Sequence, residues 1–446
     1  MSNRLNGGGA AHEHAGRDDH GAFELRAQLQ LLLRQRLGFA AASCVLGAAG
    51  TASVFAAWVA RMRPPRLRFA PTAANLALLR SIPLLHRSYV PHILAWNAHL
   101  AGIIGYIKLP VYRYLGRARA EETVLLSDGG CVSLLWATGS AGPREVGAPV
   151  LLLLPGINND ACMGYVQHVQ AVFADALPHV AVAALNWRGL GGLPLTSPRP
   201  YSAACHTDVA DVLVHLRARH PTSALYAAGW SQGGNVLINH LASAGDGCLL
   251  TAALAVSPAM DPGAVDAHFD ATLLGRTYRR ILLVPLLRYY LRHRVAMGHG
   301  TLAVLRGFAG GHFFESLGLP SYGVSADALR FEATSAARVG AVRRPLLVIA
   351  SEDDPIVPLA SLPLAAMEAN PHIVTAVTRH GGHMGYTAGL SPLQHSWVDR
   401  VLVHYVRHWL RGGGGQDGSG ACGDGDTDSG SDHVFASAET PLRSRL

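Results

Sequence analysis

The sequence predicts an α/β fold in which a mostly parallel sheet is flanked by helices. Short apolar runs typical of buried strands alternate with longer helical segments along the chain, as a doubly wound sheet requires. Of the 446 residues, 49% are hydrophobic, which is enough for one large core. Eight strands are expected, at 123–126, 131–136, 150–154, 180–185, 225–229, 252–256, 346–350 and 372–378.

An insertion is expected between the strands at 252–256 and 346–350. Roughly ninety residues separate them, far more than one crossover helix needs, so we interpret about 262–344 as a helical cap. Within it, residues 279–292 are apolar with basic edges, which suits a lid or a membrane-facing surface and equally suits helices packed on the core. The whole α/β domain is expected at 119–411, after a helical region at 61–118.

The two ends of the chain differ from the middle. Residues 37–60 carry no charge and lie between arginines, which predicts a single membrane-spanning segment of open orientation. The polar segments 1–36 and 412–446 cannot bury a core and are expected to be disordered. The last residues, Ser444-Arg445-Leu446, resemble a peroxisomal address and give the alternative location.

Composition excludes several classes of protein. The net charge of +7 comes almost wholly from arginine, and without a nucleic-acid motif it indicates either affinity for anionic membrane surfaces or only a codon bias. Six scattered cysteines show no C-x-x-C spacing, which favours reduced thiols over a disulfide framework. No histidine cluster has metal-ligand spacing in the region of the motifs described next. We therefore expect no metal and no cofactor, and protein partners stay open.

Gly229-Trp230-Ser231-Gln232-Gly233 follows an apolar strand and precedes a helical segment. This setting is typical of a nucleophile elbow. The turn is so tight that its flanking positions tolerate almost no side chain, which explains the two glycines. The serine lies at a helix N-terminus, where an oxyanion is also favoured. We predict that Ser231 is a nucleophile; the alternative is an ordinary glycine-rich turn.

A nucleophilic serine needs a histidine base and a carboxylate that orients the histidine. Asp354 follows the strand at 346–350 and His383 follows the strand at 372–378. Parallel strands end at one edge of a sheet, and the order serine, acid, histidine fits the elbow motif. We expect Asp354 and His383 to complete a triad with Ser231.

Each of these assignments has a neighbour of the same type. Asp354 is preferred to Asp353 because the D-x-x-V-P turn follows it, and Asp353 and Glu352 are expected to be solvated. His383 is preferred to His380 because Gly381-Gly382 would let the loop swing that imidazole over the sheet. His380 is expected at the surface or behind the triad.

The oxyanion formed by an attacked carbonyl needs two backbone donors. One comes from the residue after the nucleophile and the other from the loop after an early strand. Here these are Gln232 and, in the loop Pro155-Gly156-Ile157 that follows the strand at 150–154, Ile157.

Further motifs follow one another between Tyr89 and Leu410. Besides the elbow they are Trp96-Asn97-Ala98-His99-Leu100, Ser127-Asp128-Gly129-Gly130, Leu154-Pro155-Gly156-Ile157, Asn186-Trp187-Arg188-Gly189, Ser197-Pro198-Arg199-Pro200-Tyr201-Ser202, Asp353-Asp354-Pro355 and Gly381-Gly382-His383-Met384-Gly385. In this order they resemble the α/β-hydrolase-domain family of single-pass membrane phospholipases and monoacylglycerol lipases, plant embryogenesis-associated proteins and bacterial carboxylesterases. The resemblance implies an α/β-hydrolase fold with the triad Ser231, Asp354 and His383.

The chain departs from that family in two places. Asn158-Asn159-Asp160 replaces an oxyanion loop that contains glycine or serine. The family's N-G-H-L-Q-T has become Asn97-Ala98-His99-Leu100-Ala101-Gly102.

Three functions fit these residues. The favoured one is a membrane-anchored serine hydrolase that cleaves lipid esters through an acyl-enzyme, with head group and chain length open. The second is an acyltransferase or thioesterase that uses the same acyl-enzyme; His206 and Asp211 spell H-x-x-x-x-D, as in glycerolipid acyltransferases, although the stretch is also typical of a helix start. The third is a non-catalytic scaffold on a hydrolase fold.

Overall fold

A nine-stranded sheet forms the centre of the computed structural model, which describes residues 62–92, 95, 97–107, 120–138, 147–309, 322–388 and 396–412. The strand order is β1-β9-β8-β7-β6-β4-β5-β3-β2. The strands are β1 (Arg66–Phe69), β2 (Glu121–Leu125), β3 (Cys131–Trp136), β4 (Val150–Leu154), β5 (Ala181–Asn186), β6 (Leu225–Trp230), β7 (Ala252–Val256), β8 (Leu346–Ser351) and β9 (Ile373–Thr378).

The six strands from β4 to β9 run parallel, and β1, β2 and β3 pair antiparallel at the two edges. The parallel strands are buried along their whole length, as expected for a sheet covered on both faces. Alternate residues of β4 enter different cores: Leu152 and Leu154 enter one cluster, Leu151 and Leu153 the other.

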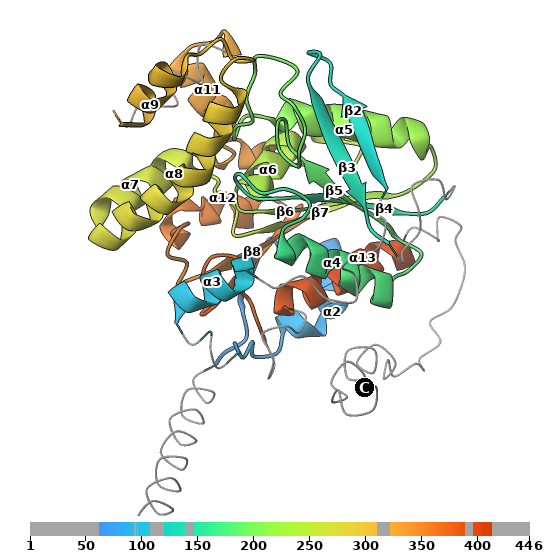
Figure 1. The fold of residues 1–446 in the computed structure, drawn as a ribbon. Coiled ribbons are helices and arrows are strands. Elements are labelled where there is room, and N and C mark those ends of the chain that lie inside the picture. The colour runs from blue at the N-terminus through green and yellow to red at the C-terminus, as the bar shows by residue number, and fades with distance from the viewer. Residues whose placement is uncertain are drawn as a thin grey trace, which may run out of the picture. The chain divides into compact units, whose positions relative to one another are not determined.

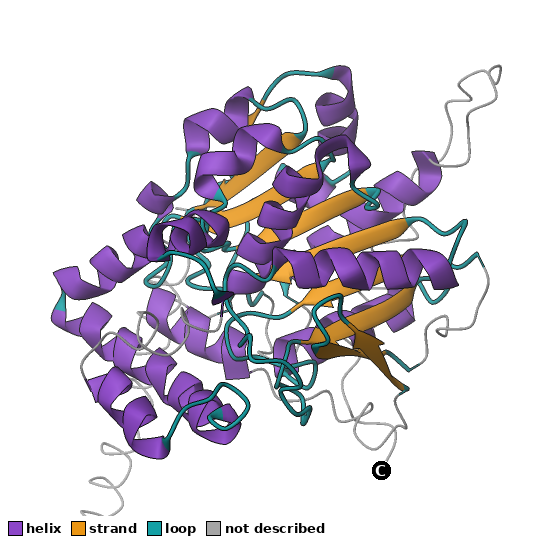
Figure 2. Cartoon of the chain, turned by 90° about the horizontal axis from the view of Figure 1, so that it is seen from above, coloured by secondary structure: helices purple, strands orange, loops and turns teal. Residues whose placement is uncertain are grey.

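Helices cover both faces of the sheet (Figure 2). The first core lies under α5 (His206–Arg219), α6 (Gln232–Ala244) and α12 (Leu364–Ala369). The second lies under α2 (Ala73–Arg80), α4 (Gly164–Ala176) and α13 (Trp397–Gly412). Helix α3 spans Ala98–Ile107, and short 3-10 helices are η1 (Pro83–Leu85), η4 (Gly245–Gly247), η6 (Ala336–Ala341) and η7 (Leu359–Ser361).

The eight predicted strands are present within two residues of their expected bounds, but the sheet has a ninth strand, so the expected eight is corrected. Strand β1 pairs with β9 and lies in the region expected to be helical, 61–118. Its four residues are too short for a periodicity signal. Leu67 and Phe69 pack on the core, and Arg66 and Arg68 pair with Glu352 and Glu368.

Four α-helices occupy the described part of the segment between β7 and β8, and Figure 1 shows them grouped on one side of the sheet. They are α7 (Pro262–Ala271), α8 (Leu273–His293), α9 (Thr301–Ala309) and α11 (Ala326–Ala333). In α8, Leu286, Tyr289 and Tyr290 are buried, whereas Ile281 and Val284 are exposed. One side of this helix therefore packs on the core and another faces solvent.

Within the residues that the structure describes, no helix combines the length and apolarity needed to cross a bilayer. Gly412, the first residue of the predicted tail 412–446, ends helix α13 instead. The rest of that tail with Ser444-Arg445-Leu446, the tail 1–36 and the predicted membrane segment 37–60 lie outside the described residues. These assignments stay predictions.

Candidate active site

Ser231 occupies the turn between β6 and α6. Its backbone has φ 51° and ψ −118°, a strained conformation for any residue except glycine. A Cβ on Gly229 would lie 2.6 Å from the Gly233 carbonyl oxygen, and a Cβ on Gly233 would lie 2.2 Å from the Leu154 oxygen. The turn is thus as tight as the motif predicts, and neither glycine can be replaced without moving backbone.

A chain of hydrogen bonds joins Ser231, His383 and Asp354. His383 Nε2 lies 2.9 Å from Ser231 Oγ, and His383 Nδ1 lies 2.9 Å from Asp354 Oδ2. The side chains of His383 and Asp354 are only 10% and 2% exposed. With Nδ1–H donating to the carboxylate, Nε2 is free to accept the serine proton.

The Asp354 carboxylate is held from a second side. Its Oδ1 accepts the backbone N–H groups of Ile356 and Val357, each at 2.9 Å. These donors belong to the D-x-x-V-P turn by which the sequence distinguished Asp354 from Asp353. Two N–H donors fix the orientation of this carboxylate beside the imidazole of His383.

A second carboxylate–histidine pair lies beside the first. Asp353 Oδ2 is 3.2 Å from His380 Nδ1, and both side chains are 26% exposed. Asp353 Oδ1 also accepts the Gly382 N–H at 2.9 Å. Glu352 pairs with Arg66 of β1. Asp353 thus braces the backbone of the loop that carries both histidines.

Two aromatic side chains fix the loop after β4. Tyr165 of α4 accepts the Gly156 N–H at 2.9 Å, and Trp187 donates its indole N–H to the Pro155 carbonyl oxygen at 3.1 Å. The peptide unit between Pro155 and Gly156 is therefore held at both ends. A Cβ on Gly156 would lie 3.4 Å from the Cβ of Ser231, so this loop lies directly against the serine.

The two expected oxyanion donors flank this contact. Ile157 follows Gly156 in the fixed loop, and Gln232 is the first residue of α6, where backbone N–H groups have no partner inside the helix. The sequence did not reveal that Tyr165 and Trp187 hold this loop, because these contacts depend on how α4 and the end of β5 meet the loop in space.

The polar residues Asn158-Asn159-Asp160 form a turn held by side chains. Asn158 has φ 53°, which asparagine tolerates well. Asn159 Nδ2 donates to the Tyr165 hydroxyl at 3.1 Å, and Asp160 Oδ1 accepts the Cys162 N–H at 2.9 Å. The side chains of Asn159 and Asp160 therefore hold this turn.

Helix α3 packs backbone to backbone on the loop that carries His383. A Cβ on Gly382 would lie 2.2 Å from the Ala98 oxygen, and a Cβ on Gly385 would lie 2.5 Å from the Ala101 oxygen. We expected the glycine pair to give this loop freedom to swing. The structure shows a further role for Gly382 and Gly385: they let helix α3 pack closely against the loop.

Gly102 and Gly105 supply the α3 side of this contact. A Cβ on Gly105 would lie 2.5 Å from the Gly385 Cα, and a Cβ on Gly102 would lie 3.4 Å from the His383 oxygen. Gly102 is one of the positions at which the chain departs from the family's N-G-H-L-Q-T. A side chain there would contact the backbone of His383.

His99, on the same helix, binds the inserted helices. Its Nδ1 lies 2.7 Å from the Tyr278 hydroxyl of α8, and the two rings stack with centroids 5.7 Å apart. Burial, and then the charge of nearby Asp354, raise the pKa of Tyr278. The pair therefore joins α3 to α8 near Asp354.

The H-x-x-x-x-D residues bind separate partners. His206 Nε2 lies 3.4 Å from Glu332, whereas Asp211 Oδ2 accepts the N–H and the hydroxyl of Ser127, each at 2.8 Å. Burial also lowers the pKa of His206. This arrangement does not resemble a histidine–aspartate pair that shares a proton.

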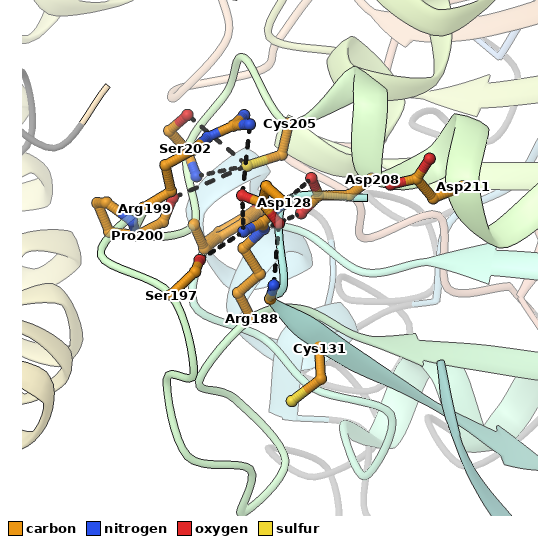
Figure 3. Close-up of polar contacts among 12 residues, drawn as sticks. Asp128, Cys131, Arg188, Ser197, Arg199, Pro200, Ser202, Cys205, Asp208 and Asp211 are labelled. Atoms are coloured by element: carbon orange, nitrogen blue, oxygen red, sulfur yellow. Dashed lines mark hydrogen bonds and ion pairs between the residues drawn. The ribbon is translucent and has the colours of Figure 1, made fainter. Parts of the chain in front are cut away.

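A buried arginine joins the loop after β5 to α5 and to the turn between β2 and β3 (Figure 3). Arg188 donates two hydrogen bonds to Asp208, at 2.5 and 2.7 Å, one to Asp128 at 2.7 Å and one to Ser197 at 2.9 Å. Burial opposes the charge, but the bonds to Asp208 outweigh it and raise the Arg188 pKa. The N-W-R-G and S-P-R-P-Y-S motifs are thereby tied together.

Cys205, next to this cluster, is fully buried, and burial raises the pKa of its thiol to about 12. A thiol that stays protonated is a poor nucleophile. Across the described ranges, no three histidine, cysteine, aspartate or glutamate side chains come together as metal ligands.

Comparison with known proteins places this fold and site in context. The chain is 29% identical over 304 residues to embryogenesis-associated protein EMB8 of Picea glauca, covering 64% of this chain and 65% of that protein. It is 27% identical to phospholipase ABHD3 of Homo sapiens, covering 74% of this chain and 81% of that one. It is 26% identical to monoacylglycerol lipase ABHD2 of Danio rerio, covering 77% and 83%.

A family model described as the alpha/beta hydrolase fold matches residues 149–389, more than half of the chain. This span holds the elbow, the loop after β4 and both carboxylate–histidine pairs. The chain therefore belongs to the alpha/beta hydrolase fold family.

Proposed function

We propose that this protein is a membrane-associated serine hydrolase that cleaves carboxylic esters of lipids through an acyl-enzyme. The observation that carries the proposal is the chain from Ser231 through His383 to Asp354, with both links at 2.9 Å. A serine at this distance from a buried, oriented imidazole can lose its proton as it attacks.

In the proposed reaction, Ser231 Oγ attacks the ester carbonyl carbon while His383 Nε2 takes the hydroxyl proton. The carbonyl oxygen becomes an oxyanion, which the backbone N–H groups of Ile157 and Gln232 stabilise. Collapse of this intermediate breaks the bond to the alcohol, and His383 returns the proton to the departing oxygen. Asp354 stays ionised and keeps the imidazole in place.

The acyl-enzyme is then resolved by water. His383 removes a proton from the water as it attacks the acyl carbon, a second oxyanion forms, and the proton returns to Ser231 as the free acid leaves. If a second alcohol or a thiol entered in place of water, the same intermediate would transfer the acyl group. That outcome is the alternative of an acyltransferase.

A lipid substrate is supported by the relatives and by the exposed side of the inserted helices. The named relatives include a phospholipase and a monoacylglycerol lipase. On α8, Leu273, Ile281 and Val284 are 73%, 60% and 51% exposed. Exposed large apolar side chains are favourable where a surface meets acyl chains.

The decisive experiment replaces the nucleophile. Ser231→Ala should abolish labelling by a fluorophosphonate probe and lower ester hydrolysis by several orders of magnitude, since no acyl-enzyme can form. The assay panel contains phospholipids, monoacylglycerols and acyl-CoAs, with product detection that separates free acid from transferred acyl groups. Undiminished labelling of Ser231→Ala would remove the proposed nucleophile, and a protein inert on every substrate would favour the scaffold.

Membrane attachment has a separate test. Deleting residues 1–62 removes the predicted spanning segment 37–60 and leaves β1 in place. We expect the shortened protein to leave carbonate-washed membranes, to keep short-chain ester hydrolysis, and to lose activity on long-chain lipids. If it still sediments with washed membranes, the anchor lies elsewhere, with α8 the first place to look.

A further inference from the structure

Helix α8 is firmly packed only along its second part, after Pro285. The residues buried there are Leu286, Tyr289, Tyr290 and His293. Before Pro285 the one buried residue of the helix is Gly275, whereas Leu274 and Ile281 are exposed. A proline inside a helix removes a backbone hydrogen bond and weakens the helix at that point. The first part of α8 is therefore placed mainly by its contacts with other elements.

Helix α7 and the first part of α8 pack closely on each other. A Cβ on Gly275 would lie 2.5 Å from the Phe269 carbonyl oxygen, so the two backbones meet at this glycine. Arg279 of α8 also donates to the carboxylate of Asp270 in α7 at 2.7 Å. Residues 262–284 thus form one unit of two helices, which we name the cap hairpin.

The cap hairpin makes two contacts toward the loops that carry Asp354 and His383. His268 of α7 donates its Nε2–H to the carbonyl oxygen of Pro355, the residue after Asp354, at 3.3 Å. The Tyr278 hydroxyl of α8 lies 2.7 Å from His99 Nδ1 of α3, and their rings stack at an angle of 21°. One contact reaches the loop of the acid, and the other reaches the helix that covers the loop of His383.

Helix α3 meets the His383 loop at the same end as it meets Tyr278. The Ala98 carbonyl oxygen lies against Gly382, and His99 is the next residue along α3. The side chains of Leu100 and Ile103 are exposed, so part of α3 faces solvent. A helix with an exposed side can tilt away from the loop beneath it unless another contact restrains it. The Tyr278 hydroxyl supplies such a restraint one residue from the point of contact with the loop.

We propose that His99 and Tyr278 are positioning residues for catalysis, whose contact holds α3 on the His383 loop and keeps the imidazole aligned with Ser231. This inference rests on the proposed acyl-enzyme reaction. Both hydrogen bonds of His383 are 2.9 Å long, and a displacement of about 1 Å at a reacting group can cost about a hundredfold in rate. Because the pair acts through α3, its loss should lower kcat more than it changes KM.

The first test is Tyr278→Phe in the full-length protein, which removes the hydroxyl and keeps the ring that stacks on His99. For a short-chain ester, kcat should fall about five- to thirtyfold while KM changes by less than about threefold. The rate of labelling by a fluorophosphonate probe should fall by a similar factor, because labelling also needs the aligned serine and histidine. A purely structural hydroxyl would leave both rates unchanged in the folded protein.

Variants of His99 show whether the two residues act through one contact. His99→Leu should also lower kcat, and the double variant with Tyr278→Phe should lose no more than His99→Leu alone. His99→Asn should restore most of the lost kcat, since its amide oxygen can accept the Tyr278 hydroxyl where Nδ1 does. The loss in His268→Ala should instead multiply with that of Tyr278→Phe, because His268 contacts the other loop.

Tyr405→Phe is the matched control. The Tyr405 hydroxyl of α13 donates to the Pro345 carbonyl oxygen at 3.0 Å, in the core under the opposite face of the sheet. Its loss should lower the thermal midpoint and leave both kcat and the labelling rate unchanged. Circular dichroism of every variant shows that the measured protein is folded.

Wild-type kcat and labelling rate in folded Tyr278→Phe would overturn the proposal. So would multiplying losses in the double variant of His99→Leu and Tyr278→Phe, because the two residues would then act separately. The proposed function is judged by Ser231→Ala: hydrolysis that survives this change refutes the acyl-enzyme and the positioning role together. Serine-dependent hydrolysis that is insensitive to Tyr278→Phe refutes only the positioning role.

Discussion

Two carboxylate–histidine pairs lie side by side at the ends of β8 and β9, and they differ in burial and reach. Asp354 and His383 are 2% and 10% exposed and their bonded atoms are 2.9 Å apart, whereas Asp353 and His380 are each 26% exposed and 3.2 Å apart. The first pair extends to Ser231. The second extends to the Gly382 N–H and so to the loop backbone.

The comparison teaches that residue type alone does not select a catalytic pair. Each pair combines an aspartate from the loop after β8 with a histidine from the loop after β9. What separates them is which histidine reaches the serine and which carboxylate accepts two backbone N–H groups. A buried carboxylate with two N–H donors orients an imidazole more firmly than a solvated one can.

The largest contrast is expected between the two histidines. His383→Ala should lower kcat by about four to six orders of magnitude, because Ser231 loses its base. His380→Ala should change kcat by less than about tenfold, since it removes only a part-exposed partner of Asp353. Steady-state hydrolysis of a short-chain ester by both purified variants measures the difference. Equal losses would mean that both histidines take part in the proton relay.

Substitution of the two aspartates should also lower kcat unequally, but by a smaller factor than for the histidines. Asp354→Asn should lower kcat by about 10⁴, because the amide favours the wrong imidazole tautomer. Asp353→Asn should stay near wild type, since an amide oxygen can still accept the Gly382 N–H. A reversed ranking would assign the orienting role to Asp353. Circular dichroism and the thermal midpoint check that both variants fold.

Gly105→Ala tests whether α3 positions the loop that carries both histidines. The new Cβ would lie 2.5 Å from the Gly385 Cα, so either the helix or the loop must move. We expect kcat to fall up to about a hundredfold with a smaller change in KM, because a displaced imidazole loses its alignment with Ser231. Gly340→Ala, where a Cβ meets nothing within 4 Å, should leave kcat unchanged. Wild-type kcat in Gly105→Ala would show that the loop tolerates displacement.

The smallest effect concerns the brace provided by Asp353. Asp353→Ala removes the acceptor of the Gly382 N–H, so kcat should fall by a few fold and the free energy of unfolding by about 1 kcal/mol. Asp353→Asn, which keeps an acceptor oxygen, is the control. If both variants behave alike, the bond to Gly382 contributes nothing to the loop, and the second pair is only a surface contact.

The sequence predicted those strands and turns whose conformation is set by residues adjacent in the chain. The apolar runs of β4 and β8 marked buried strands, and the glycines around Ser231 marked a tight turn. The fold class followed from their order. The preference for Asp354 over Asp353 used the turn after it, and the structure bonds that carboxylate to the same turn. The catalytic roles themselves stay predictions.

What the sequence could not predict are contacts between distant segments. Strand β1 is defined by pairing with β9, not by its own four residues. The packing of α3 on the histidine loop requires glycines on both elements. Neither segment's own sequence predicts that it contacts the other. The support of the oxyanion loop by Tyr165 and Trp187 likewise depends on how three elements meet in space.

The α3 contact has a consequence for how the chain can be cut. The matched family region begins at residue 149, and the domain boundary expected from sequence was 119. Neither span contains the helix whose backbone lies against the His383 loop, nor the strand that extends the sheet beside β9. A fragment chosen at either boundary would expose the glycine face of that loop to water. A fragment that keeps both contacts must therefore start before Arg66, so its boundary is set by packing rather than by the extent of sequence similarity.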